Sequence, residues 1–184
     1  SILEIMKYNP SLLSFSGDKL LGSVQAGIII GKKELIEKIK KNQLLRMLRV
    51  DKITLSILED TLNSYLKNEL HDIPTLNMLF ATLETLEQKA NSLFEKIKDI
   101  CKCEIIKTQT LIGGGTTPNK KIPSIALCIK DETYKPNQLE KLFRKNNLIA
   151  RIENEKLLLD FRTIQENEIE KIAVIIKKIF QRAN

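Results

Sequence analysis

One lysine of this chain stands where a lysine can do chemistry. Lys19 lies in a short polar turn between two apolar runs, residues 12–15 and 28–30. A lysine held among small residues between two strands can be partly withdrawn from water, and desolvation of this kind lowers the pKa of an amine. The neutral amine is the form that attacks a carbonyl carbon to make a Schiff base. A Schiff-base lysine is therefore one interpretation of this pattern, and a surface lysine in a hairpin turn is the alternative that the pattern alone favours.

Two arginines form a second candidate site. Arg46 and Arg49 are three residues apart in a predicted connector, residues 42–50, and on a helical turn their guanidinium groups would point the same way. Two such groups suit a tetrahedral oxyanion such as phosphate. Residues 32–52 hold eight basic and three acidic side chains, which is +5 of the net charge of +7. A polyanionic ligand is one interpretation. A solvated face is the alternative, and spacing alone favours it.

The residues around Lys19 resemble a known enzyme family. The segment Ser14-Phe15-Ser16-Gly17-Asp18-Lys19-Leu20-Leu21-Gly22, with residues 25–31, resembles the cofactor-lysine segment of fold-type I pyridoxal 5'-phosphate (PLP) enzymes. It is most similar to the bacterial selenocysteine synthases, the L-seryl-tRNA(Sec) selenium transferases. The resemblance continues through Arg46-Met47-Leu48-Arg49-Val50-Asp51-Lys52, which is also specific. Weaker matches follow at residues 113–116, 149–153 and 157–162.

This resemblance implies roles for four residues. Lys19 would carry PLP and move the Cα proton of the substrate, and Gln25 would reach the cofactor phosphate. Arg46 and Arg49 would bind selenophosphate, the anionic selenium donor. The implied reaction converts seryl-tRNA(Sec) to selenocysteinyl-tRNA(Sec) through an aminoacrylate, in a cytoplasmic homo-oligomer built from dimers, with no membrane partner and no metal.

Two alternatives stay open beside this hypothesis. One is a related PLP-dependent lyase that acts on a small amino acid. The other is a non-catalytic remnant that serves as an oligomerisation or tRNA-contacting module. One departure bears on both, because the family usually has Gly-Gly-Pro-Gln where this chain has Gly22-Ser23-Val24-Gln25. The chain also opens on Ser1 inside a helical pattern, so we expect the C-terminal portion of a longer protein, inactive as a transferase by itself.

The first half of the chain predicts elements that would position these residues. Buried strands are expected over residues 12–15 and 26–30, because their apolar runs do not alternate with polar residues. The other expected elements are helices, over residues 1–9, 33–41, 52–68 and 75–100. Asp51 is the expected N-cap of the third helix.

The second half predicts a small α+β domain. Strands are expected over residues 104–111, 124–129, 148–152 and 156–161, with helices over residues 136–146 and 166–181. Gly113-Gly114-Gly115 is expected to be a loop, and Arg151, Asp160 and Arg162 to form structural ion pairs. The predicted fold class is α/β of fold-type I. Residues 1–80 would be the C-terminal part of the large PLP-binding domain and residues 81–184 the small domain, joined by a long helix.

Composition limits the class of protein. The 184 residues are 42% hydrophobic, and no apolar run approaches the roughly 20 residues that a membrane-spanning helix needs. The three cysteines, Cys101, Cys103 and Cys128, do not form a disulfide framework, and the chain has one histidine. We therefore expect reduced structural thiols and no metal site, in a cytosolic protein.

Overall fold

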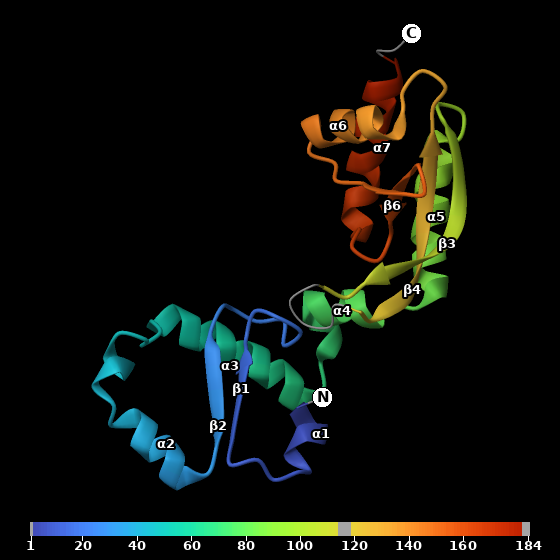
Figure 1. Ribbon diagram of the computed structural model, residues 1–184. Helices are drawn as coiled ribbons and strands as arrows, with labels where there is room; N and C mark the ends of the chain where they lie inside the picture. Colours follow the sequence, from blue (N-terminus) through green and yellow to red (C-terminus); the bar gives the residue numbers. More distant parts are fainter. Residues whose placement is uncertain (1, 114–118, 182–184) are drawn as a thin grey trace. The chain divides into compact units, whose positions relative to one another are not determined.

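The computed structural model describes residues 2–113 and 119–181 and divides into two compact units, Ser1–Asn77 and Met78–Asn184 (Figure 1). Both units mix helices with sheet, as the predicted α/β class requires. Within the described ranges, no helix combines the length and the apolar character needed to cross a lipid bilayer. Two glycines of the predicted loop, Gly114 and Gly115, lie outside those ranges.

The first unit is a two-stranded sheet with helices. Its strands β1 (Leu12–Ser16) and β2 (Gly27–Gly31) pair antiparallel, with Ser16 opposite Gly27. The helical elements are α1 (Ile2–Met6), α2 (Lys33–Lys40), the 3-10 turn η1 (Gln43–Arg46), α3 (Lys52–Lys67) and the 3-10 turn η2 (Leu70–Asp72). The helix α4 (Pro74–Phe80) begins in this unit and ends in the second, which starts at Met78.

The two predicted strands are confirmed, but their predicted burial is wrong. Leu12 is 41% exposed and Ile29 is 47% exposed. Successive side chains of a strand point to opposite faces, so a continuous apolar run places half of its side chains on each face of the sheet. The residues of β2 accordingly alternate between more and less exposed positions, as do those of β1 from Leu12 to Phe15.

The predicted N-cap of α3 is confirmed. The Asp51 Oδ1 atom accepts a hydrogen bond from the Thr54 N–H at 2.8 Å, which satisfies one of the free donors in the first turn of the helix. Several apolar side chains in and before α3 remain in contact with solvent. They include Leu48 (74% exposed), Ile53 (73%) and Leu66 (84%). Burial therefore contributes little at these positions of the first unit.

The second unit is a four-stranded antiparallel sheet in the order β3-β4-β6-β5. Its strands are β3 (Lys102–Leu111), β4 (Lys121–Lys130), β5 (Arg151–Glu153) and β6 (Lys156–Asp160). Its helices are α5 (Leu83–Ile97), α6 (Pro136–Lys145) and α7 (Ile169–Gln181), which follows the 3-10 turn η3 (Glu166–Glu168). The predicted order of elements in this half is confirmed.

The core of the second unit lies between the three helices and one face of the sheet. Figure 1 shows α5 along the β3–β4 hairpin, and α6 and α7 beside β6. The strand side chains of this core alternate along β4 and β6, namely Ile125, Leu127, Ile129, Leu157 and Leu159. Each is at most 2% exposed. This packing fixes the second unit far more firmly than burial fixes the first.

The predicted long helix over residues 75–100 is wrong, because the helix breaks after α4. Thr82 takes an extended conformation, and its Oγ1 accepts a hydrogen bond from the Thr85 N–H at 3.2 Å, so it is the N-cap of α5. The Arg162 side chain donates to the carbonyl oxygens of Met78, Leu79 and Ala81, where α4 ends. The apolar periodicity runs through both helices and hides this break.

Candidate active site

Lys19 lies in a closed loop that continues the β1–β2 hairpin. The Gly17 N–H donates to the Ala26 carbonyl at 2.8 Å, and the Ser23 N–H donates back to the Gly17 carbonyl at 2.9 Å. A Cβ atom at Gly17 would lie 2.6 Å from the Val24 carbonyl oxygen. Only glycine allows this close approach of two backbone segments. The loop that presents Lys19 therefore has a defined backbone.

The Lys19 side chain is half-exposed, and its Nζ lies 3.7 Å from the Asp18 Oδ2 atom. The second carboxylate oxygen of Asp18 accepts a hydrogen bond from the Ser16 hydroxyl. This bond, more than the nearby Lys19 ammonium, holds the pKa of Asp18 below its usual range. Asp18 is therefore a turn residue fixed by Ser16, and the Lys19 amine is accessible to a ligand.

The loop rests on α3 and on the residues before α4. The Tyr65 hydroxyl donates to the Leu21 carbonyl at 3.1 Å, and the hydroxyls of Ser23 and Thr61 lie 2.9 Å apart. Gly22 has a φ of +76°, and a Cβ atom there would lie 2.5 Å from the Ile73 Cγ2 atom. These contacts fix the segment that follows Lys19.

The other predicted site residues lie in the same unit. Gln25 is exposed and stands beside the buried Ala26, at the end of the Lys19 loop. Arg46 ends η1, whereas Arg49 follows it in backbone without regular structure, so the two do not share one helical turn. Both arginines are exposed. Among the described residues, no hydrogen bond or ion pair joins either arginine to the Lys19 loop.

A comparison with known families matches most of this chain. The SelA family model, described as L-seryl-tRNA selenium transferase, matches residues 1–165, which include Lys19, Gln25 and both arginines. The chain belongs to the L-seryl-tRNA selenium transferase family. The prediction of this family from the lysine and arginine segments is thus confirmed.

Individual members of the selenium transferase family are close relatives. The L-seryl-tRNA(Sec) selenium transferase of Aliarcobacter butzleri is 71% identical over 98% of this chain, and that of Sulfurimonas denitrificans is 65% identical over 97%. The chain spans about 40% of the length of each of these relatives. Among solved structures, an ornithine delta-aminotransferase of Plasmodium falciparum is similar at 14% identity with a TM-score of 0.39, over 94% of this chain and 41% of that chain.

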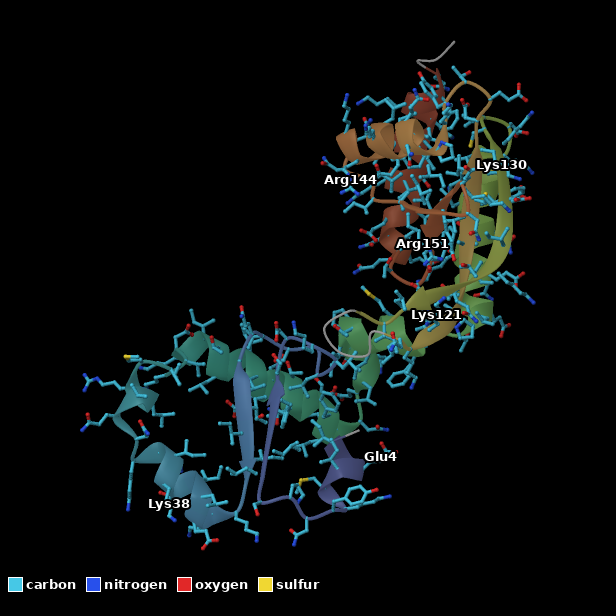
Figure 2. The ribbon with its side chains drawn as sticks, in the orientation of Figure 1. Glu4, Lys38, Lys121, Lys130, Arg144 and Arg151 are labelled. Atoms are coloured by element: carbon cyan, nitrogen blue, oxygen red, sulfur yellow. The ribbon has the colours of Figure 1, made fainter. Side chains whose placement is uncertain are left out.

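The charged cluster predicted in the second unit of this family member is present. Arg151, which Figure 2 labels, lies 3.3 Å from Asp160 and donates to the Thr108 hydroxyl at 2.9 Å. The Ser124 hydroxyl donates to Asp160 at 2.5 Å. The Arg162 backbone N–H also donates to Asp160, at 3.0 Å. The Arg162 guanidinium, however, binds backbone carbonyls instead of a carboxylate. The cluster is therefore structural.

Sequence reasoning missed Thr61 and Tyr65 as neighbours of the Lys19 loop. They are four residues apart, so they share a face of α3. Their spacing of four residues along the predicted helix was the available signal. A hollow of about 480 Å³ was also missed, in the second unit. Lys107, Lys121 and Lys156 line it together with Glu153 and the apolar Leu158.

Proposed function

We propose that this chain is the part of a PLP-dependent L-seryl-tRNA(Sec) selenium transferase that carries the cofactor lysine. The reaction converts seryl-tRNA(Sec) to selenocysteinyl-tRNA(Sec) with selenophosphate as the selenium donor. The observation that carries the proposal is the identity of 71% over 98% of the chain to a protein of that name, combined with an accessible lysine in a rigid loop. The activity belongs to a longer protein, since the chain spans about 40% of its relatives.

The surroundings of Lys19 fit the attachment of PLP. The Nζ atom lies beyond hydrogen-bond distance from the Asp18 carboxylate, and half of the side chain is exposed, so a carbonyl carbon can reach the amine. Lys19 would hold the cofactor covalently, and the exposed Gln25 would contact its phosphate. When bound, PLP supplies an electron sink for negative charge at the substrate Cα.

Lys19 has a second role in this proposal. When the Nζ atom is not bound to the cofactor, it would be the base that removes the substrate Cα proton and later returns a proton. A base on a rigid loop keeps a constant distance to the substrate, which a flexible turn would not provide. The closed backbone from Gly17 to Ala26 supports this role.

Arg46 and Arg49 are proposed to bind selenophosphate. Both guanidinium groups are exposed, and they follow the lysine-rich helix α2, on which Figure 2 shows Lys38. The donor is a tetrahedral anion, and guanidinium groups bind such anions through paired N–H donors. The connector between η1 and α3 has no regular structure, and this would allow the two side chains to converge on one anion without sharing a helical turn.

The alternative lyase is less well supported. An enzyme that acts on a free amino acid needs a cation for the substrate carboxylate, and a small-domain arginine is a common choice in PLP enzymes. Arg162 is 7% exposed and donates to four backbone carbonyls, so its guanidinium is not available. In seryl-tRNA the carboxyl group is esterified and carries no charge to bind.

We also propose the domain roles that the sequence suggested. Residues 1–80 would complete a large PLP-binding domain of fold-type I, and residues 81–184 would form its small domain. The exposed apolar side chains of the first unit, such as Ile53 and Leu66, support a larger domain or a homo-oligomer built from dimers that covers them. The antiparallel sheet with its helices on one face supports a separate small domain.

Borohydride trapping tests this proposal. The longest natural protein that contains this chain is mixed with PLP, reduced, and mapped by mass spectrometry. We expect one PLP for each chain, attached to Lys19, and no such product in Lys19→Arg. The exposed Lys38 on α2 is the matched control, because Lys38→Arg should keep full labelling at Lys19. Scattered labelling over surface lysines would refute the cofactor role, and turnover of seryl-tRNA by the 184 residues alone would refute the need for a longer protein.

A further inference from the structure

We propose that Tyr65 and Thr61 of α3 are positioning residues that hold the loop from which Lys19 reaches the reacting atoms. This inference rests on the proposed function, because it assigns the loop a purpose only if Lys19 carries the cofactor. The contacts themselves are independent of that function. They join a helix to a loop about 40 residues earlier in the chain.

The first contact fixes the backbone two residues after Lys19. The Tyr65 hydroxyl donates to the Leu21 carbonyl at 3.1 Å. Burial raises the pKa of Tyr65, so the phenol keeps its proton and remains a donor throughout the neutral range. The same turn is closed by the Gly22 N–H, which donates to the Lys19 carbonyl at 2.9 Å. Tyr65 therefore anchors the turn that begins at Lys19.

The second contact fixes the loop four residues after Lys19, and its direction follows from the protons available. The Thr61 hydroxyl donates its one proton to the Ile57 carbonyl at 3.0 Å. In the 2.9 Å contact with Ser23, Thr61 must then be the acceptor and Ser23 the donor. The Ser23 N–H meanwhile donates to the Gly17 carbonyl at 2.9 Å. Ser23 thus links the two ends of the loop to α3.

The two contacts act together because Thr61 and Tyr65 lie one turn apart on the same face of α3. Within the described residues, the contact of the Lys19 amine is a loose one with the Asp18 carboxylate, at 3.7 Å. The side chain of Lys19 is therefore aimed by its backbone, and that backbone is held by α3. A small displacement of a reacting group lowers the rate of the chemical step much more than it changes substrate binding.

Two conservative variants of the full-length protein test the proposal. Tyr65→Phe and Thr61→Val each remove one hydroxyl and keep the size of the side chain. The control is Tyr8→Phe, since Tyr8 is 87% exposed. We measure hydrogen exchange at the Gly22 and Ser23 amides, the fraction of Lys19 labelled by PLP and borohydride, and kcat and KM for seryl-tRNA. Losing one part-buried hydrogen bond, at about 1 kcal/mol, should speed exchange by about fivefold in each variant and not in the control.

The other readouts separate positioning from folding. If Tyr65 and Thr61 position Lys19, kcat falls several-fold at unchanged KM, and labelling of Lys19 becomes slower. Exchange that stays within about twofold of the wild-type rate in both variants would overturn the docking itself. Faster exchange with unchanged kcat and labelling would overturn the positioning role. If wild-type Lys19 takes up no PLP, the proposed function fails and this role fails with it, whereas the exchange rates still decide whether α3 holds the loop.

Discussion

Replacing Arg162 by methionine should destabilise the second unit more than any surface substitution there. The guanidinium group is almost fully buried, with the residue 7% exposed, and burial lowers its pKa. One terminal nitrogen donates to the carbonyls of Met78, Leu79 and Ala81 at 2.9 to 3.2 Å. The other donates to the Pro123 carbonyl at 2.5 Å. Methionine keeps the apolar stem and removes every one of these donors.

The expected loss follows from the carbonyls that are left without a partner. Each lost hydrogen bond costs about 1 kcal/mol net, and the carbonyls at the end of α4 have no other donor in the helix. The sum is about 3 to 4 kcal/mol in the free energy of unfolding of the second unit, which corresponds to about a few hundredfold faster exchange of its core amides. Arg162→Lys keeps the charge with fewer and less fixed donors, so its effect should be intermediate.

Native-state hydrogen exchange of β4 and β6 measures this loss in the second unit alone. The Phe161 N–H, which donates to the Ile125 carbonyl at 3.0 Å, is a suitable core amide. Arg144→Met is the matched control, because Arg144 is exposed on α6 and pairs with Glu140 one turn away (Figure 2). Such a helix pair contributes only about 0.3 to 0.5 kcal/mol. Equal effects of Arg162→Met and Arg144→Met would refute the assignment of Arg162 as the cap of α4.

Two further outcomes follow from pKa shifts in the described residues. The hydrogen bond from the Thr54 N–H lowers the pKa of Asp51 in the folded protein. The ionised Asp51 therefore stabilises α3 fully at pH values above about 4, the pKa of an aspartate in the unfolded chain. This stabilisation is lost as the pH falls through the lower pKa that Asp51 has in the folded protein. Asp51→Asn keeps a capping oxygen and should remove this part of the acid sensitivity, measured as helix circular dichroism between pH 6 and 2; an unchanged pH profile would contradict it. Burial raises the pKa of Cys101 to about 12, so little of its thiol is ionised at pH 8. Iodoacetamide at pH 8 should therefore alkylate Cys101 about a thousandfold more slowly than a free cysteine, until urea unfolds the chain. Fast labelling of Cys101 in the folded chain would contradict this prediction.

The second unit could be predicted from sequence almost completely. Its strands carry continuous or alternating apolar residues, such as those around Leu127 and Leu158, and its turns carry residues suited to them. Asn154 and Glu155 both adopt positive φ values, 49° and 57°, at the predicted hairpin between β5 and β6. Local pattern and tertiary packing agree here, so each element was predictable by itself.

The break between α4 and α5 was not predictable from apolar periodicity. The pattern continues through Ala81 and Thr82, and nothing local shows that Arg162, some 80 residues later, takes up the carbonyls of α4. Thr82 followed three residues later by Thr85 was a weak capping signal. The prediction that β1 and β2 are buried was wrong for a related reason. In the described residues these strands form a two-stranded sheet that is not covered on both of its faces.

The candidate site shows the same division between local and tertiary information. Lys19 was predicted from its neighbours in sequence, but the partners that hold its loop, Thr61 and Tyr65, come from a helix about 40 residues later in the chain. In the described part of the first unit few residues are buried, among them Gly17, Ala26 and Ile73. A core cannot fix the loop under these conditions. Its backbone must be fixed by hydrogen bonds to α3 and by close approaches that only glycine permits, which explains why polar residues of an exposed helix matter for the position of a lysine.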